Sequence, residues 1–236
     1  MAEATLFEAL TASCREDWRA YVEHGFVRGL ADGSLPEARF RHYLAQDYRF
    51  LLHYSRAWSL AVVKSDQLDD LRQSAALVDL LLNHEIALHV EFCRGWGLDE
   101  AALAATPEAP ANRLYTRYVM DRGLAGDLLD LLVALAPCGL GYAEVGRRLL
   151  ADPATRLEGN PYRAWIELYG GREFQEGAAA MAEQLDRVAG RRGLLRPWPS
   201  SPRWPSLAET FATAVRLEVG FWDMGLAPGV LEAEGA

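Results

Sequence analysis

Apolar positions recur every three to four residues through nearly every segment longer than about ten residues. Strict alternation of apolar and polar positions is missing, and no Asn-Gly or Asp-Gly turn lies between two alternating runs. The pattern predicts an all-α protein with helices near residues 4–30, 36–62, 67–95, 110–123, 125–150, 159–169, 171–191 and 204–225.

Helix boundary signals support this division. Residues 34–37 (Ser-Leu-Pro-Glu) form a start signal, and Gly97 is placed to end the third helix. Residues 196–205 are rich in proline and tryptophan and are expected to be a connection within one domain. We therefore predict a single helical domain over 1–227, followed by a loose tail over 228–236.

Three predicted helices carry a reactive side chain within an otherwise apolar stripe. The stripe of the fifth helix comprises Leu131, Leu135, Cys138, Tyr142, Val145 and Leu149. That of the second helix comprises Phe40, Tyr43, Asp47, Phe50 and Tyr54. That of the last helix comprises Leu207, Phe211, Ala214, Glu218, Phe221 and Gly225.

Asp47 and Glu218 thus occupy positions where the pattern requires apolar residues. Burying a carboxylate without partners costs several kcal/mol, so the fold must either supply hydrogen-bond partners or use these groups for chemistry. The same stripes carry aromatic side chains that would line a cavity suited to a planar heteroaromatic ring, namely Tyr43, Phe50, Tyr142 and Phe221.

Cys138 follows Pro137 and precedes Gly139 and Gly141. Proline interrupts helical hydrogen bonding, so we expect the helix to kink or restart here, with the small residues leaving room for a ligand. A restart would place the thiol at a helix N-terminus, where the dipole lowers its pKa. A cysteine on an apolar stripe can equally be a small core residue, and the residues alone leave both interpretations open.

Composition narrows the class of protein. The net charge is −9 and no run of basic residues occurs, which argues against a nucleic-acid partner. We find no leader-like segment and no apolar stretch of about 18 residues, so we expect no membrane span. Three scattered cysteines do not form a disulfide framework, which favours a reducing, cytoplasmic location, and we expect Cys14 and Cys93 to be core residues.

His84, Glu85 and His89 invite a metal interpretation. His84 and His89 are five residues apart and therefore do not share a helix face, unlike the pair four apart in a zinc helix. Glu85 and His89 have the spacing of a structural pair. We expect neither a metal site nor an organic cofactor.

Five motifs point to a known family. They are FRHYLAQDYRFLL at Phe40–Leu52, LYTRY around Tyr115, PCGLGYAEVGRRL at Pro137–Leu149, PYRAWIELYGG at Pro161–Gly171, and EVGFWDM at Glu218–Met224. In content and order the chain resembles the TenA (thiaminase II) family, part of a larger group of heme-oxygenase-like helical proteins, over almost its whole length.

The resemblance implies a function and residue roles. Cys138 would be the nucleophile that adds to a pyrimidine ring, Glu218 its acid/base partner, and Asp47 the acceptor for an exocyclic amino group. The wall of the site would be Phe50, Tyr115, Tyr142, Tyr169 and Phe221. The implied substrates are small aminopyrimidines, such as 4-amino-5-aminomethyl-2-methylpyrimidine, or thiamin. Some relatives carry tyrosine at the position of Phe50, so one hydroxyl is lost here.

The resemblance also implies a homotetramer, for which Trp198 and Trp204 would suit an interface. Two other classes of function stay open at this stage. One is a non-catalytic, pyrimidine-binding or regulatory protein on the same scaffold. The other is a redox enzyme using haem or a quinone precursor, for which His24 would be the candidate ligand.

Overall fold

The computed structural model describes residues 4–227, and every regular element in that range is a helix. In chain order these are α1 (Leu6–Ser13), α2 (Arg15–Val22), α3 (Gly25–Asp32), α4 (Glu37–Lys64), α5 (Leu68–Leu80), the π-helix η1 (Leu81–Glu85), α6 (Ile86–Arg94), α7 (Glu100–Ala105), α8 (Pro110–Ala125), α9 (Leu128–Ala151), α10 (Arg163–Gly170), α11 (Arg172–Arg191), the 3₁₀-helix η2 (Trp198–Ser200) and α12 (Trp204–Leu226). The all-α prediction is confirmed, and the tail predicted over 228–236 lies outside the described residues.

The first predicted helix, over 4–30, is wrong as one element. It is three short helices, α1, α2 and α3, because the backbone leaves helical geometry at Cys14 (φ −131°, ψ 46°) and again at Glu23. Thr5 and Glu8 begin α1 with a reciprocal capping box. Gly33, with a φ of 76°, ends α3 in the left-handed conformation that glycine adopts at least cost.

The helix predicted over 67–95 is present but not uniform. One π-helical turn, η1, separates α5 from α6, and such turns shift the register of the side chains that follow. Gly97 follows the end of α6 with a φ of 76°, as its position in the sequence indicated. The sequence pattern missed α7, which Asp99 caps by accepting a hydrogen bond from the amide of Ala102.

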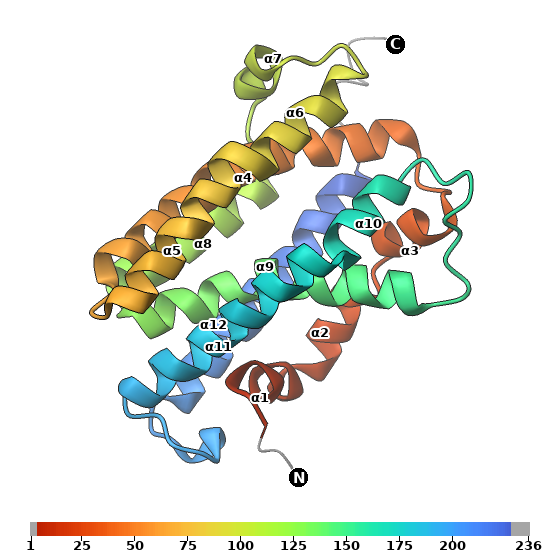
Figure 1. The fold of residues 1–236 in the computed structure, drawn as a ribbon. Helices are drawn as coiled ribbons and strands as arrows, with labels where there is room; N and C mark the ends of the chain where they lie inside the picture. Colours follow the sequence, from red (N-terminus) through yellow and green to blue (C-terminus); the bar gives the residue numbers. More distant parts are fainter. Residues whose placement is uncertain (1–3, 228–236) are drawn as a thin grey trace. The chain divides into compact units, whose positions relative to one another are not determined.

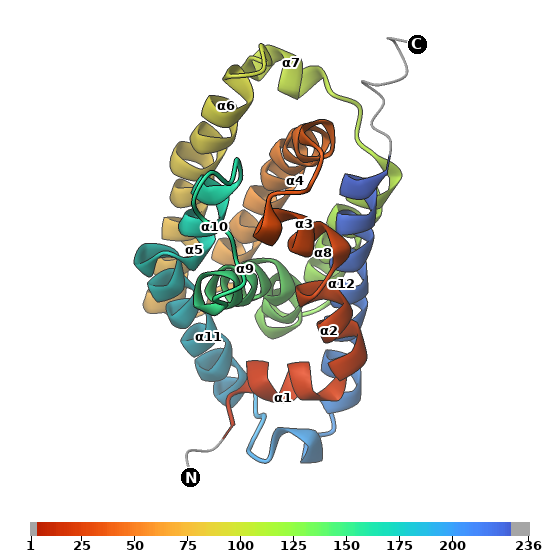
Figure 2. The same cartoon turned by 90° about the vertical axis from the view of Figure 1, so that its right-hand side faces the viewer.

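The helices pack into two compact units. The first comprises the chain up to Leu35 together with Leu132–Trp222. Within it, α1 packs against α11, and α10 also packs against α11 (Figure 2). Asn160, in the loop before α10, donates to the carbonyl oxygens of Leu30 and Arg156, and so fastens that loop to α3.

The second unit comprises Pro36–Leu131 and the end of α12 from Asp223. Its longest helix is α4, which α5 and α8 flank and which also contacts α6 and α7 (Figure 1). Lys64, at the end of α4, donates to the carbonyl oxygen of Gly126 after α8. The single domain predicted over 1–227 stays a prediction.

Helix α9 is continuous through Pro137, so the predicted restart is wrong. Pro137 is buried, and its carbonyl oxygen accepts from the hydroxyl of Tyr21 on α2. A Cβ at Gly141 would lie 2.3 Å from the Tyr21 ring, so this glycine makes room for a neighbouring helix rather than for a ligand. Cys138 therefore lies inside a helix and not at a helix N-terminus.

Helix α9 is also, among residues 4–227, the one helix long and apolar enough to cross a membrane. The expectation that no such stretch exists was therefore too strong. Of its most apolar window, with a mean hydropathy of 1.6, 78% is buried within the protein. A core helix that is packed on all sides is apolar all round and has the same composition.

Trp198 is buried, contrary to the prediction that it is a surface aromatic. Its indole N–H donates to the carbonyl oxygen of Ala4, and the Arg196 guanidinium lies 4.6 Å from its ring centre. This side chain holds the N-terminal segment to the loop before α12. Trp204, by contrast, is half-buried.

Candidate functional site

An aromatic cluster in the first unit surrounds Tyr142 of α9. Its ring centre lies 5.0 Å from that of Tyr169 and 5.9 Å from that of Trp165, both on α10. The ring centre of Trp222 on α12 lies 5.3 Å from that of Tyr142. Four buried rings, two of them with hydroxyls and two with indole N–H groups, therefore meet at these helices.

Glycines let α9 and α10 approach closely enough for this cluster to form. A Cβ on Gly146 would lie 2.3 Å from the carbonyl carbon of Tyr169, and a Cβ on Gly170 would lie 2.7 Å from the carbonyl oxygen of Gly146. The backbones are therefore in direct contact, and Tyr169 is fixed by the packing of its own main chain.

Cys138 lies one helical turn before Tyr142 and differs from the other two cysteines. Its side chain is partly exposed, whereas Cys14 and Cys93 are buried, as predicted. Burial raises the pKa of both buried thiols to about 11, which keeps them protonated and unreactive. By exposure, Cys138 is the cysteine able to meet a dissolved substrate.

Glu218 and Phe221 lie on α12, both buried as their stripe predicted. Glu218 is four residues, and so one turn, before Trp222, just as Cys138 is one turn before Tyr142. The contact between Tyr142 and Trp222 therefore joins the two helices that carry the predicted nucleophile and the predicted acid/base group.

Asp47 is buried in the second unit, and its carboxylate accepts two hydrogen bonds. The Nε2 atom of His89 lies 2.6 Å from its Oδ2 atom, and the Tyr43 hydroxyl donates to the same oxygen at 3.4 Å. The Nδ1 atom of His89 lies 2.9 Å from the backbone carbonyl oxygen of Glu85. His89 thus contacts the main chain of Glu85, and a pair between the two side chains stays a prediction.

This geometry determines the charge of His89. Both ring nitrogens face oxygen acceptors, an arrangement satisfied when both carry a proton. Burial by itself lowers the pKa of His89, but the hydrogen bond and charge of Asp47, helped by Glu85, outweigh burial and raise it. We therefore describe Asp47 and His89 as a buried ion pair.

Phe50 and Tyr115 also lie in the second unit and contact each other, with ring centres 5.1 Å apart. Tyr54 stacks on Phe50 at 5.4 Å. The eight predicted site residues thus divide between the units. Those in the first are Cys138, Tyr142, Tyr169, Glu218 and Phe221; those in the second are Asp47, Phe50 and Tyr115. That all eight serve one site stays a prediction.

Sequence reasoning missed Trp165 and Trp222, and it named His89 without predicting its contact with Asp47. The signal for His89 was the buried position of Asp47, which required a partner from another helix. Trp165 and Trp222 lie within the motifs that carried the family resemblance. The redox alternative required His24 as a ligand, but the Nδ1 atom of His24 caps α3 by accepting from the amide of Phe26.

Comparison with known proteins defines the class. The model of the TENA/THI-4/PQQC family matches residues 11–227, and the chain belongs to this family. An aminopyrimidine aminohydrolase from Halalkalibacterium halodurans is 35% identical over 208 residues, which cover 88% of this chain and 89% of the relative.

Two solved structures are also similar to this chain. A TenA family transcription regulator from Silicibacter sp. matches with a TM-score of 0.89 and 47% identity, covering 94% of this chain and 96% of that one. A protein from Shewanella denitrificans, described as having a heme oxygenase-like fold, matches with a TM-score of 0.71 at 14% identity, covering 98% and 96% of the two chains. The predicted heme-oxygenase-like helical fold is confirmed.

Proposed function

We propose that this protein hydrolyses thiamin-related aminopyrimidines, with Cys138 as nucleophile and Glu218 as acid/base. The relatives named aminopyrimidine aminohydrolase support an enzyme of the thiaminase II type, which cleaves a carbon–nitrogen bond. The substrate we favour is 4-amino-5-aminomethyl-2-methylpyrimidine, which with one water gives the 5-hydroxymethyl compound and ammonia. Thiamin cleavage would be a related activity.

The difficulty of this reaction lies in the ring. An amine on the exocyclic methylene leaves slowly because the aromatic pyrimidine cannot push electrons toward it. When the Cys138 thiolate adds to a ring carbon, aromaticity is broken and the ring electrons expel the amine. Water then adds to the methylene, and the thiolate departs as aromaticity returns.

Glu218 would handle the protons in both halves of this sequence. As the thiolate adds, Glu218 delivers a proton to a ring nitrogen, and as the thiolate departs it takes that proton back. A buried carboxyl one turn from an aromatic cluster suits this role.

The other predicted residues would bind and orient the ring. Asp47 would accept from the exocyclic amino group, with His89 holding the carboxyl group in position. Tyr142 and Tyr169 would provide stacking surface and hydroxyls, and Phe50 stacking alone. No role in this scheme needs a metal or an organic cofactor.

One observation carries the proposal above all. Of the three thiols, Cys138 is the one that combines partial exposure with an aromatic cluster one turn away. Cys14 and Cys93 are buried, with pKa values near 11. If Cys138 were a core residue, we would expect its side chain to be buried like those of Cys14 and Cys93.

The test is a product assay with the aminomethyl pyrimidine and with thiamin, on wild type, Cys138→Ala and the matched variant Cys14→Ala. We expect Cys138→Ala to form no hydroxymethylpyrimidine while its circular dichroism is unchanged, and Cys14→Ala to turn over normally. Near-normal turnover by Cys138→Ala would refute the nucleophile assignment.

The same assay separates the enzyme from a binding or regulatory protein. If wild type binds the pyrimidine but releases no product over hours, the non-catalytic alternative is favoured. Direct action on DNA has little electrostatic support, since a net charge of −9 repels a phosphate backbone.

As part of the same proposal, the enzyme is a cytosolic homotetramer. Since Trp198 is buried, Trp204 is the one of the two tryptophans left to take part in an interface. Light scattering on purified protein would give the mass directly, and a monomer at micromolar concentration would contradict this assignment.

A further inference from the structure

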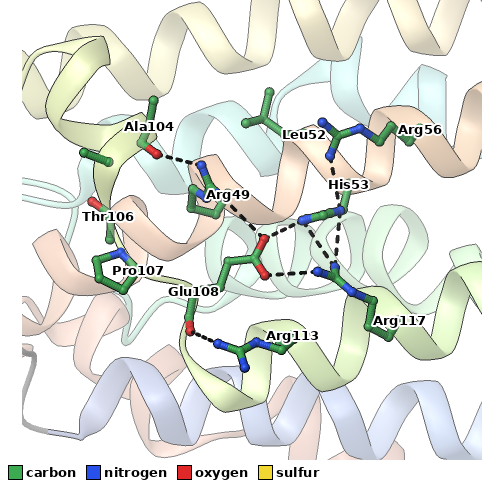
Figure 3. A pocket seen from close by; sticks show the side chains of 11 residues that line it. Arg49, Leu52, His53, Arg56, Ala104, Thr106, Pro107, Glu108, Arg113 and Arg117 are labelled. Atoms are coloured by element: carbon green, nitrogen blue, oxygen red, sulfur yellow. Dashed lines mark hydrogen bonds and ion pairs between the residues drawn. The ribbon is translucent and has the colours of Figure 1, made fainter.

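A pocket of about 640 Å³ lies on the second unit, and none of the side chains assigned above lines it (Figure 3). It is bounded by Arg49, His53 and Arg56 of α4, by the loop that joins α7 to α8, and by Arg113 and Arg117 of α8. In Figure 3 the side chains of Arg49, His53 and Arg117 converge from both helices on the carboxylate of Glu108, which the loop contributes.

The pocket is strongly positive in a strongly negative protein. Four guanidinium groups and one imidazole line it, against a single carboxylate, that of Glu108. The chain as a whole has 33 acidic residues against 24 basic ones. Such a local excess of positive charge is expensive to assemble from self-repelling groups, and an anion would relieve the repulsion.

Glu108 neutralises only part of this charge. Its carboxylate hydrogen-bonds His53, lies 3.3 Å from Arg117 and lies 3.6 Å from Arg49. Burial raises the pKa of Glu108, but the His53 hydrogen bond and charge, with the charges of Arg117 and Arg49, outweigh burial and lower it. The carboxylate is thus held ionised, and it marks where a negative charge is stabilised.

Other arginines of the pocket have N–H groups that are not used in hydrogen bonds to the protein. Arg113 reaches only the carbonyl oxygen of Glu108, at 3.3 Å, and Arg56 only the Nδ1 atom of His53, at 3.3 Å, so within residues 4–227 neither has a carboxylate partner. The Nε atom of Arg49 is buried and finds no acceptor in the same range. Unlike an ordinary surface ion-pair network, this cluster leaves guanidinium donors unused.

The pocket wall is fixed in place by a second set of hydrogen bonds. Gln46 donates to the carbonyl oxygen of Pro107 and accepts from the amide of Ala109. Asn112 donates to the carbonyl oxygen of Gln46. The loop that carries Glu108 is therefore tied to both α4 and α8, so the pocket is formed before any ligand arrives.

We propose that this pocket binds a small anion of the diphosphate class, held by Arg56, Arg113 and Arg117. Guanidinium groups bind phosphate oxygens in pairs, and the volume of the pocket admits a diphosphate with a small organic group attached. An anion with two phosphate groups matches an excess of three or four positive charges better than a single carboxylate does.

The position of the pocket gives such binding a consequence. The helices that form it, α4 and α8, also carry Asp47, Phe50 and Tyr115. A ligand that bridges Arg56 on α4 and Arg113 on α8 would stiffen the packing of these two helices. The binding proposal itself does not depend on the proposed hydrolase activity.

The experiment is calorimetric titration of the full chain with inorganic pyrophosphate and with ADP, at about 20 mM salt. We expect saturable binding to wild type, weakened at least about tenfold in Arg56→Gln/Arg113→Gln. Arg172→Gln, an exposed arginine of the first unit, is the matched control and should bind as wild type does. Tighter binding of ADP than of pyrophosphate identifies an organic ligand, and the reverse a free diphosphate.

A second variant changes affinity in the opposite direction. Glu108→Gln removes the carboxylate that competes for the same guanidinium groups and keeps its shape, so it should bind pyrophosphate several-fold tighter. Absence of saturable binding to wild type, or equal affinity in the double-arginine variant and Arg172→Gln, would overturn the proposal. So would weaker binding by Glu108→Gln with its fold intact.

Discussion

The Nε2 atom of His89 on α6 lies 2.6 Å from the Oδ2 atom of Asp47 on α4, and both side chains are buried. The other ring nitrogen of His89 meets the main-chain oxygen of Glu85, the last residue of the π-helix η1. An irregular turn of helix thus precedes the histidine that contacts a carboxylate we propose to bind the substrate, and π-turns are frequent at functional sites.

The pair makes the stability of the fold depend on pH. Because the pKa of His89 is raised above its ordinary value of 6.5, its protonation stabilises the folded state fully below that value. This contribution is lost as the pH rises through the raised folded-state pKa. Urea unfolding should therefore show a larger loss of stability for His89→Gln at about pH 6 than at about pH 9.

His84→Gln is the control, since His84 is exposed on the neighbouring π-helix. Its effect should stay within about 0.5 kcal/mol at either pH. A deficit for His89→Gln that is the same at both pH values would mean that His89 acts by packing alone and that the pair is not ionised.

Removing the other partner should cost more. Asp47→Ala leaves a protonated imidazole buried without its counter-charge, for which we expect a loss of about 3–5 kcal/mol. Asp47→Asn keeps an acceptor for His89 and for the Tyr43 hydroxyl and should cost less. Equal free energies of unfolding for the two variants would contradict a role for Asp47 as hydrogen-bond acceptor.

The helical periodicity predicted most elements because those helices bury one continuous stripe. It failed between residues 4 and 30, where the apolar spacing continues across Cys14 and Glu23 although the backbone turns at both positions. At Pro137 the periodicity correctly predicted one helix, and the restart expected from the proline was wrong, because the tertiary packing of α9 keeps a helix together through a residue that would break an isolated one.

From the residues alone, a candidate site residue could be predicted only where a polar side chain interrupts an apolar stripe. Asp47 and Glu218 were found because a carboxylate in such a stripe is exceptional, and both are buried. The pairing of His89 with Asp47 was missed because the two residues lie on different helices, 42 positions apart, and local spacing contains no information on such a contact. The arginines of the pocket were also missed, because they lie on two different helices and form no run in the sequence.

The close contact of α9 with α10 gives a prediction about packing. Gly146→Ala would place a methyl group 2.3 Å from the Tyr169 main chain, so α10 must move, at a cost of about 3 kcal/mol. Gly177→Ala is the matched control, because Gly177 is an exposed position of α11 and nothing lies within 4 Å of its Cβ position. Thermal unfolding should show a lower Tm for the first and an equal or higher Tm for the second.

Asn160 should be needed for the loop between α9 and α10. Its amide donates to the carbonyl oxygens of Leu30 and Arg156, and its side-chain oxygen accepts from the amide of Tyr162. We expect Asn160→Ala to lose about 2–3 kcal/mol in urea unfolding, since buried main-chain groups are left without partners. Asn83→Ala, which removes an exposed hydrogen bond to Asp79, should lose under about 0.5 kcal/mol, and equal losses would contradict this role.

Glu218 provides the sharpest test of the proposed chemistry on α12. Glu218→Gln keeps the shape of the side chain but can no longer carry a proton to the ring, so kcat should fall by about 10²–10⁴-fold with a smaller change in KM. Glu209→Gln, on an exposed part of the same helix where Glu209 pairs with Arg216, should retain normal kcat. If Glu218→Gln raises KM and leaves kcat unchanged, then Glu218 binds the substrate and does not transfer a proton, and the acid/base group must be sought elsewhere.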